Sequence, residues 1–363
     1  MRVLIAPSAY KGTFSCVELA DAMGSGVKIV WPDAELDILP IADGGDGTID
    51  ALYRSIGGTV HKTSAEGPNG QLVVAPWLEF GELAIVEMAA ASGIGLLRGV
   101  LDPVNSHSKG TGQVMRSCIE RGLKNMVVCV GGSASTDGGA GLLTALGAKF
   151  WKRNGEAIAL GAGELNLIAG CNLRDAQELV RNCSIAVAVD VANPLLGNQG
   201  AAAIYGPQKG ADPATVMRLD ESLQRFADVL EMATSRQFRN MPGTGAAGGT
   251  AFGVACGLGA EIISGFEWMS TLFGLEDRVQ SADIVFTGEG QLDDQSFYGK
   301  ASGRLSAVCK KFRKPLIAIP AVADIGGNLE RLGLTKVVCA SRDGSIATLA
   351  DVSEAVQISL SGF

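Results

Sequence analysis

Short runs of aliphatic residues recur along the chain, and each is followed by a turn rich in small or acidic residues. Seven such runs are RVLIAPS from Arg2, LDILP from Leu36, LAIVEM from Leu83, NMVVCV from Asn125, SIAVAV from Ser184, ADIVF from Ala282 and KPLIAI from Lys314. Aliphatic runs without polar alternation are typical of strands that are buried on both faces, as in parallel sheets. The pattern therefore predicts a core of parallel strands.

Segments with helical spacing lie between these runs. Ser15 and Glu18 have the S-x-x-E spacing of a capping box, which predicts a helix running from there toward Ile29. An amphipathic pattern over residues 110–123 predicts a second helix, and Asp212 followed by Pro213 marks the start of a longer one. This alternation of strands and helices predicts the α/β class.

The two ends of the chain share one order of elements: strand, Gly-rich turn, helix. The middle is less regular, and residues 66–80 predict an antiparallel strand after a turn that contains Pro, Asn and Gly. We expect a doubly wound parallel-sheet domain formed by residues 1–66 and 282–363. A second, mixed α/β domain is expected to be inserted at residues 67–281, with the active site in the cleft between the two domains.

The composition excludes several classes of binding partner. The formal charge is −8, which argues against nucleic acid or an anionic membrane surface, because both require a positive face on the protein. There are two histidines, His61 and His107, so a histidine-rich metal site is excluded. The eight cysteines contain no C-x-x-C pair, and no apolar run is long enough to span a membrane. We expect a cytoplasmic protein that acts on a small molecule.

Acidic residues gather in the glycine-rich turns that follow the predicted strands. They are Asp43, Asp46, Asp137, Asp190, Glu289 and Asp293. A solvated turn is the usual explanation for any one of them. Several at one end of a sheet favour a site in which Mg²⁺ bridges carboxylates and phosphates, because ligands bind beyond the carboxyl ends of parallel strands. That arrangement is typical of phosphoryl transfer.

Lysines next to glycine could supply the cations. Lys11 follows the first strand, Lys209 lies in GPQKGA and Lys300 lies in FYGKASG. The usual P-loop pattern is absent. A G-x-G-x-x-G match at Gly243, Gly245 and Gly248 follows no predicted strand, so close packing against another element is favoured over dinucleotide binding, although its amides could face a phosphate.

Together, the blocks PIADGGDGT, GGSASTDGGAGLLTALGA, DVANPLLGNQGAAAIYGPQKGA, GTGAAGG and TGEGQLDDQSFYGK resemble the type I glycerate kinase family. The resemblance covers nearly the whole chain. It implies a flavodoxin-like domain built from both chain ends around an inserted domain. It also implies transfer of the γ-phosphoryl group of ATP, with Mg²⁺, to D-glycerate, with the 2-hydroxyl favoured as acceptor.

On this basis we expect Asp190 to be the base and Lys11 to be a catalytic cation. The residues expected to bind substrate or phosphate are Ser133, Ser135, Asp137, Asn193, Lys209, Gly245, Gly248 and Lys300. The expected metal ligands are Asp43, Asp46, Glu289 and Asp293.

The sequence also departs from the family pattern. Ser8 stands in place of an acid, Thr136 in place of Asn, and Gln291 in place of Arg. These changes keep two alternatives open: a kinase for another short hydroxy acid, and a catalytically weak paralogue that senses a nucleotide or a sugar acid. The oligomeric state stays open as well, with a homodimer as one option.

Overall fold

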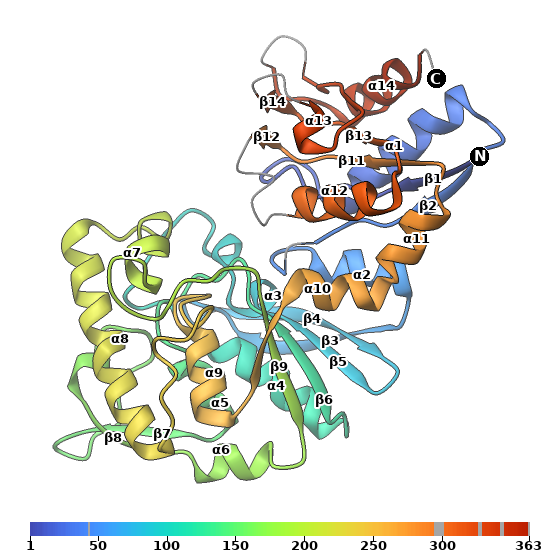
Figure 1. Ribbon diagram of the computed structural model, residues 1–363. Helices are drawn as coiled ribbons and strands as arrows, with labels where there is room; N and C mark the ends of the chain where they lie inside the picture. Colours follow the sequence, from blue (N-terminus) through green and yellow to red (C-terminus); the bar gives the residue numbers. More distant parts are fainter. Residues whose placement is uncertain (43, 294–300, 326–328, 342–344, 362–363) are drawn as a thin grey trace. The chain divides into compact units, whose positions relative to one another are not determined.

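The computed structural model describes residues 1–363 except 43, 294–300, 326–328, 342–344 and 362–363 (Figure 1). The chain forms two compact units. Unit 1 comprises Met1–Asp43, Asp50–Gly57 and Phe266–Phe363, and unit 2 comprises Gly44–Ile49 and Gly58–Gly265.

Unit 1 is built on a five-stranded sheet in the order β15-β13-β11-β1-β2. Its strands are β1 (Arg2–Ile5), β2 (Glu35–Ile38), β11 (Ile284–Thr287), β13 (Leu316–Ala318) and β15 (Lys336–Val337). All the pairings are parallel. Counted within this sheet, the order is 2-1-3-4-5, which is the flavodoxin-like arrangement. The expected α/β fold class is confirmed, with the sheet formed from both ends of the chain.

Helices cover this sheet, and a small parallel pair of strands accompanies it. The elements are α1 (Cys16–Val30), α2 (Thr48–Ile56), α10 (Gly265–Phe273), α11 (Leu275–Ser281), β12 (Gln291–Asp293), α12 (Ala301–Phe312), β14 (Val322–Asp324), α13 (Leu329–Leu332) and α14 (Leu349–Leu360). Helix α1 begins at the predicted capping box of Ser15 and Glu18.

The five-stranded sheet is buried on both faces. On one face, Val3 and Phe286 share a core with residues of α1 and α14. Helices α1 and α14 pack closely because Gly26 has no side chain; a Cβ there would lie 2.5 Å from Ser353 O. On the other face, Leu4 and Val285 are 0% exposed. This burial explains the aliphatic runs in the sequence.

Unit 2 contains a six-stranded sheet in the order β10-β9-β6-β5-β4-β3. Its strands are β3 (Thr59–Glu66), β4 (Leu72–Phe80), β5 (Leu83–Glu87), β6 (Asn125–Cys129), β9 (Ser184–Val189) and β10 (Glu261–Ser264). The strands from β10 to β5 are parallel, whereas β3, β4 and β5 pair antiparallel. The hairpin of β3 and β4 contains the antiparallel strand that the sequence predicts over residues 66–80.

Helices and one further hairpin complete unit 2. They are α3 (Met88–Ser92), α4 (Lys109–Glu120), α5 (Ala140–Leu146), β7 (Lys149–Lys152), β8 (Ile168–Asn172), α6 (Arg174–Leu179), α7 (Ala201–Tyr205), α8 (Pro213–Thr234) and α9 (Thr250–Leu258), with 3-10 turns at Ile94–Leu97, Leu165–Leu167 and Pro207–Lys209. Asp212 caps α8 as predicted, since its side chain accepts from Thr215 N at 2.7 Å. Within the described ranges, no helix is both long and apolar enough to cross a bilayer.

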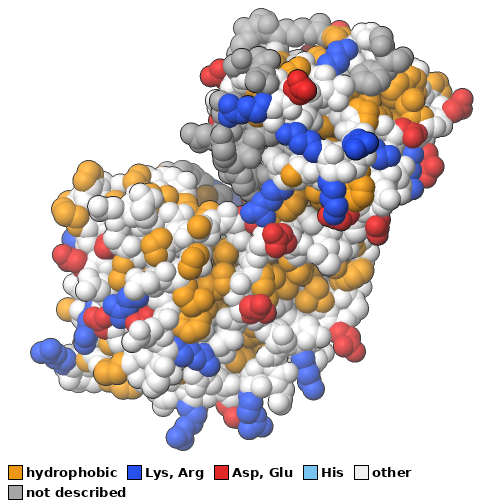
Figure 2. Space-filling view, viewed as in Figure 1, with side chains coloured by type: hydrophobic (Ala, Val, Ile, Leu, Met, Phe, Trp, Pro, Cys, Tyr) orange, Lys and Arg blue, Asp and Glu red, His pale blue; other side chains and the backbone are white. Residues whose placement is uncertain are grey.

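The bounds of the two units differ from the expected domain boundaries in three places. The short segment Gly44–Ile49 groups with unit 2. Strand β3 belongs to the sheet of unit 2, because all eight of its residues pair with β4. Helices α10 and α11 group with unit 1 from Phe266 onward. On the face drawn in Figure 2, both units present acidic and basic side chains.

Candidate active site

In unit 1, two loops that carry predicted site residues meet where the strand order of the sheet reverses. Ser8 N, after β1, donates to Gly288 O, after β11, at 2.8 Å. A Cβ on Gly290 would lie 3.6 Å from Tyr10 Cα. Open α/β sheets bind ligands beyond the carboxyl ends of their strands at this reversal. The fold therefore places the loops of Lys11 and Glu289 side by side at the usual ligand position.

Tyr10 fixes the first of these loops. Its hydroxyl donates to Ile319 O at 2.6 Å, its side chain is 2% exposed, and burial raises the pKa of the phenol. The next residue, Lys11, is exposed. Because Tyr10 is buried and hydrogen-bonded, it holds the neighbouring Lys11 at the edge of the sheet.

The remaining predicted residues of unit 1 are only partly described. Asp293 lies on β12 opposite Asp324 of β14, an acid that the sequence did not single out. Asp43 and Lys300 lie outside the described residues.

In unit 2, Asp137 joins the beginnings of two helices. Its Oδ2 accepts from Ser108 N at 2.9 Å, from Ser108 Oγ at 2.8 Å and from Gly141 N at 3.1 Å. Its Oδ1 accepts from Gly139 N at 3.1 Å. Ser108 precedes α4 and Gly139 precedes α5, so the carboxylate binds orphan N–H groups at two helix N-termini. Asp137 is 0% exposed and holds the loop after β6 in place.

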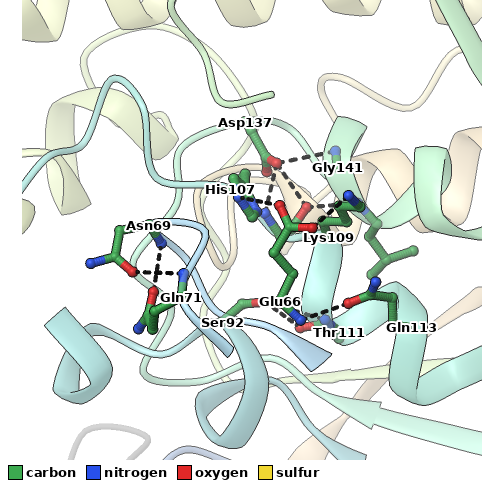
Figure 3. A network of polar contacts seen from close by, with 12 residues as sticks. Glu66, Asn69, Gln71, Ser92, His107, Lys109, Thr111, Gln113, Asp137 and Gly141 are labelled. Carbon is green, nitrogen blue, oxygen red and sulfur yellow. Dashed lines mark hydrogen bonds and ion pairs between the residues drawn. The ribbon is translucent and has the colours of Figure 1, made fainter. Parts of the chain in front are cut away.

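A second group of side chains, of which His107 is buried and Glu66 and Lys109 are half-buried, lies beside Asp137. Figure 3 shows the Glu66 side chain between His107 and Lys109. Lys109 Nζ donates to Glu66 Oε2 at 2.6 Å, and His107 Nε2 lies 3.4 Å from Glu66 Oε1. Burial lowers the pKa of His107, although the Asp137 and Glu66 carboxylates act in the opposite direction. The imidazole is therefore neutral near pH 7.

Lys209 is a buried lysine in the turn after α7, and it contacts the loop that follows β6. Its Nζ donates to Ser133 Oγ at 3.0 Å and to Ser135 O, and its side chain is 2% exposed. Burial lowers the pKa of Lys209 to about 7, partly offset by Asp137. Three residues predicted to bind substrate or phosphate thus lie together in unit 2: Lys209, Ser133 and Ser135.

The segment that carries Asp46 packs against this loop. Gly131 N donates to Gly44 O at 2.9 Å, and a Cβ on Gly131 would lie 2.7 Å from Gly45 Cα. The buried Glu87 carboxylate accepts from Gly47 N at 3.2 Å and from Ile49 N at 2.8 Å. Asp46 itself is exposed. The structure therefore brings Asp46 near the loop of Ser133.

Asp190 and Asn193 follow β9 on a neighbouring loop. Asp190 is exposed, and its Oδ1 accepts from Ser264 Oγ at 3.3 Å. Asn193 is held by Tyr205, whose hydroxyl donates to its Oδ1 at 2.6 Å, and by its own donation to Gln199 O at 2.8 Å.

The glycines of the G-x-G-x-x-G match pack against backbone. A Cβ on Gly245 would lie 2.2 Å from Pro194 O, and one on Gly248 would lie 2.1 Å from Ser135 O. The Gly245 N–H donates to Asn193 O at 2.9 Å. This geometry favours close packing, the interpretation preferred from the sequence, over a phosphate cradle.

Unit 1 carries the types of side chain that bind a nucleotide phosphate with Mg²⁺. Mg²⁺ is usually bound through one or two carboxylates together with substrate phosphates. Glu289 and Asp293 could supply such carboxylates, and Lys11 could supply a cation for the phosphates. Among the described residues, no group of three or more His, Cys, Asp or Glu side chains could hold a metal ion.

Comparison with known proteins gives consistent matches. The sequence profile of the Glycerate kinase family matches residues 3–356. The glycerate 2-kinase of Escherichia coli (strain K12) is 39% identical over 341 residues, which cover 93% of this chain and 90% of that protein. The glycerate kinase of Bacillus subtilis (strain 168) is 36% identical over 322 residues, covering 88% and 84%. A solved structure from Salmonella typhimurium LT2, provisionally described as glycerate kinase 2, matches with a TM-score of 0.84 at 35% identity and covers 99% of this chain and 96% of that one.

The fold and these matches define an α/β phosphotransferase with an alcohol acceptor. The chain belongs to the glycerate kinase family, and the resemblance found in its motif blocks is confirmed.

The sequence did not single out Glu66, Lys109 or Ser108. Glu66 reaches Lys109 across 43 positions, because β3 packs against α4. The polar stretch NSHSKGTG, which contains His107 and Lys109, is the one signal in the sequence that points to this group.

Proposed function

We propose that this protein transfers the γ-phosphoryl group of ATP to the 2-hydroxyl of D-glycerate, giving 2-phosphoglycerate. The observation that carries the proposal is the meeting of the Lys11 and Glu289 loops at the strand-order reversal of unit 1. The choice of acceptor and of its 2-hydroxyl is supported by the 39% identity to a glycerate 2-kinase.

Bound ATP and Mg²⁺ would supply the phosphoryl group and neutralise its developing charge. Lys11, with Lys300, would orient the phosphates. Glu289 and Asp293 would hold the metal, together with Asp43 and Asp46. Asp190 would accept the proton of the acceptor hydroxyl, which an ordinary carboxylate can do because phosphoryl transfer demands little of its base.

The buried residues of unit 2 divide into two roles. The acceptor would be bound by Lys209, Ser133 and Ser135, and by Asn193 on the loop after β9. Asp137 would position their loop, because its two oxygens already accept four hydrogen bonds. Gly245 and Gly248 would allow the close packing that brings the segment of Asn193 and that of Ser135 together.

A coupled assay of ADP release with D-glycerate, L-glycerate, glycolate and lactate tests this proposal. We expect turnover with D-glycerate in the presence of MgCl₂ and its loss in EDTA. Phosphorus NMR of the product would distinguish 2-phosphoglycerate from 3-phosphoglycerate. Faster turnover of another acid would show that this acid, and not D-glycerate, is the preferred acceptor. Thermal stabilisation by ATP or by one of these acids without turnover would instead favour the alternative of a catalytically weak paralogue that acts as a sensor.

A further inference from the structure

The Lys209 ammonium is buried, and no carboxylate of the described residues is bonded to it. Its hydrogen-bond partners are two neutral oxygens, Ser133 Oγ and Ser135 O. Asp137, the acid that acts on its pKa, is already bonded by the N-terminal groups of α4 and α5. Burying an ammonium without a bonded counter-ion is costly, and a bound anion would offset that cost.

Hydrogen-bond donors in this region remain available. An ammonium has three N–H groups, and those of Lys209 meet two acceptors within the described ranges. Ser133 Oγ accepts from Lys209, which leaves its own O–H to donate, and no acceptor for it occurs among the described residues. Ser135 Oγ and Thr136 Oγ1 are also buried without a partner in that part of the chain.

Of Lys209, Ser133, Ser135 and Thr136, the residue most exposed to solvent is Ser133. Its side chain is 6% exposed and it follows the exposed Gly132, whereas Ser135 and Thr136 are 0% exposed. A ligand that reaches this loop therefore meets the Ser133 hydroxyl first, with the Lys209 ammonium directly behind it.

We propose that the Ser133 hydroxyl donates to the carboxylate of the acceptor while the Lys209 ammonium, donating to Ser133 Oγ from behind, supplies the countercharge. This inference rests on the proposed function, since it assigns the carboxylate end of the proposed acceptor. A single ammonium matches the single charge of a carboxylate, whereas a triphosphate needs several cations. Lys209 acts through Ser133 and is a positioning residue.

Proton uptake is the distinctive consequence. The pKa of Lys209 is lowered to about 7 in the ligand-free protein, and a bound anion would raise it. At pH 8 most Lys209 side chains would be neutral before binding and charged afterwards. We expect D-glycerate to bind with uptake of about half a proton or more at pH 8, and with almost none at pH 6. Calorimetry in buffers of different ionisation enthalpy measures this number.

Two variants and a control test the contact and identify the group that takes up the proton. Ser133→Ala should raise KM for D-glycerate about 10-fold or more, with KM for ATP changed less than about 2-fold. Lys209→Arg stays charged at every pH and should abolish the proton uptake. Lys149→Met, at an exposed lysine paired with Asp175, is the control and should match the wild type. If Lys209→Arg does not fold, Ser133→Ala still tests the contact.

The outcomes separate this inference from the proposed function. Turnover of D-glycerate without proton uptake, or with uptake unchanged in Lys209→Arg, overturns the carboxylate subsite and leaves the proposed function intact. Proton uptake on binding D-glycerate without turnover supports the subsite and overturns the function. If a non-hydrolysable ATP analogue alone produces the uptake, the group serves a phosphate and the inference is wrong. Absence of both binding and turnover overturns both.

Discussion

Asp137 holds two helix N-termini with one carboxylate, and the loop with Ser133 and Ser135 depends on it. Its donors come from positions 108, 139 and 141, so one side chain ties α4 to α5. Lys209 then binds the same loop from the turn after α7. At the scale of single residues, the candidate acceptor site is therefore a buried framework with Ser133 at its edge.

Replacing Asp137 should weaken the fold. In Asp137→Asn, an NH₂ group would replace one of the oxygens that accept from backbone N–H groups. We expect the free energy of unfolding in urea to fall by about 2 to 4 kcal/mol, because buried donors lose a charged acceptor. Asp175→Asn, at an exposed position, should change it by less than about 0.5 kcal/mol. A similarly small loss at Asp137 would contradict the framework role.

Asp190 should affect the chemistry without affecting the fold. It is exposed at the end of β9, so Asp190→Asn removes a proton acceptor with little loss of packing. We expect kcat to fall by at least about 100-fold, with a smaller effect on ATP affinity. Steady-state kinetics alongside thermal melting would measure both. An unchanged kcat would transfer the role of base to another acid, with Asp43 and Asp293 next.

The family resemblance of the motif blocks was enough to predict which residues of unit 2 would lie near one another, and their roles stay a prediction. Lys209, Ser133, Ser135 and Asp137 were expected together and lie together in unit 2. The contact of Glu66 with His107 and Lys109 was not predicted, because it depends on the packing of β3 against α4. The carboxylate of Asp137 looked available for a ligand, and only the positions of the two helices show that its oxygens are taken.

At the scale of elements, glycines set how closely the loops of unit 2 approach. Gly248 has φ +64°, and a Cβ there would lie 2.1 Å from Ser135 O. Gly197 has φ +82° with nothing within 4 Å of its Cβ position. The two positions share a backbone conformation that favours glycine and differ in the space around them.

This pair allows a matched test of packing. Gly197→Ala should cost about 1 kcal/mol of unfolding free energy from backbone strain alone. Gly248→Ala adds a collision with the backbone of the Ser135 loop, so we expect a loss of about 3 kcal/mol or more, or insoluble protein. Denaturant unfolding compares the two variants. Equal losses would show that the loops separate easily at Gly248.

The strongly patterned elements were predictable from the sequence, and the weak ones were not. The seven aliphatic runs became β1, β2, β5, β6, β9, β11 and β13, and the capping box begins α1. Strand β10 was not anticipated, because its four residues, EIIS, form a strand through pairing with β9. The hairpin of β7 and β8 was missed for the same reason, since KFWK has no aliphatic run.

At the scale of the whole molecule, predicted site residues are divided between the two units. Lys11 and Glu289 belong to unit 1, whereas Lys209 and Asp190 belong to unit 2. The expectation that both groups line one cleft stays a prediction. If they serve one reaction, a change at Lys11 should affect turnover of an acceptor whose carboxylate is held in unit 2.

Lys11 provides that test. Because Lys11 is exposed, Lys11→Met should leave the melting temperature of the ligand-free protein within about 2 °C of the wild type. We expect kcat/KM to fall by about 10-fold or more through weaker binding of an anionic ligand. Lys62→Met, at an exposed position on β3, is the control. A large loss of stability in Lys11→Met would indicate a structural lysine.

The sheet made from both chain ends also governs when the protein can fold during synthesis. Val3 pairs with Ile284, 281 residues further along the chain, and α1 is covered by α14. At about 5 to 20 residues per second, a ribosome needs roughly 15 to 60 s to make the intervening segment. During that interval the strands of unit 2 can pair and β1 can pair with β2, whereas β11, on the other side of β1, and α14, which covers the apolar face of α1, are not yet made. The nascent N-terminus must therefore stay soluble for tens of seconds, and a chain that ends before β11 would leave one side of β1 and the apolar face of α1 uncovered.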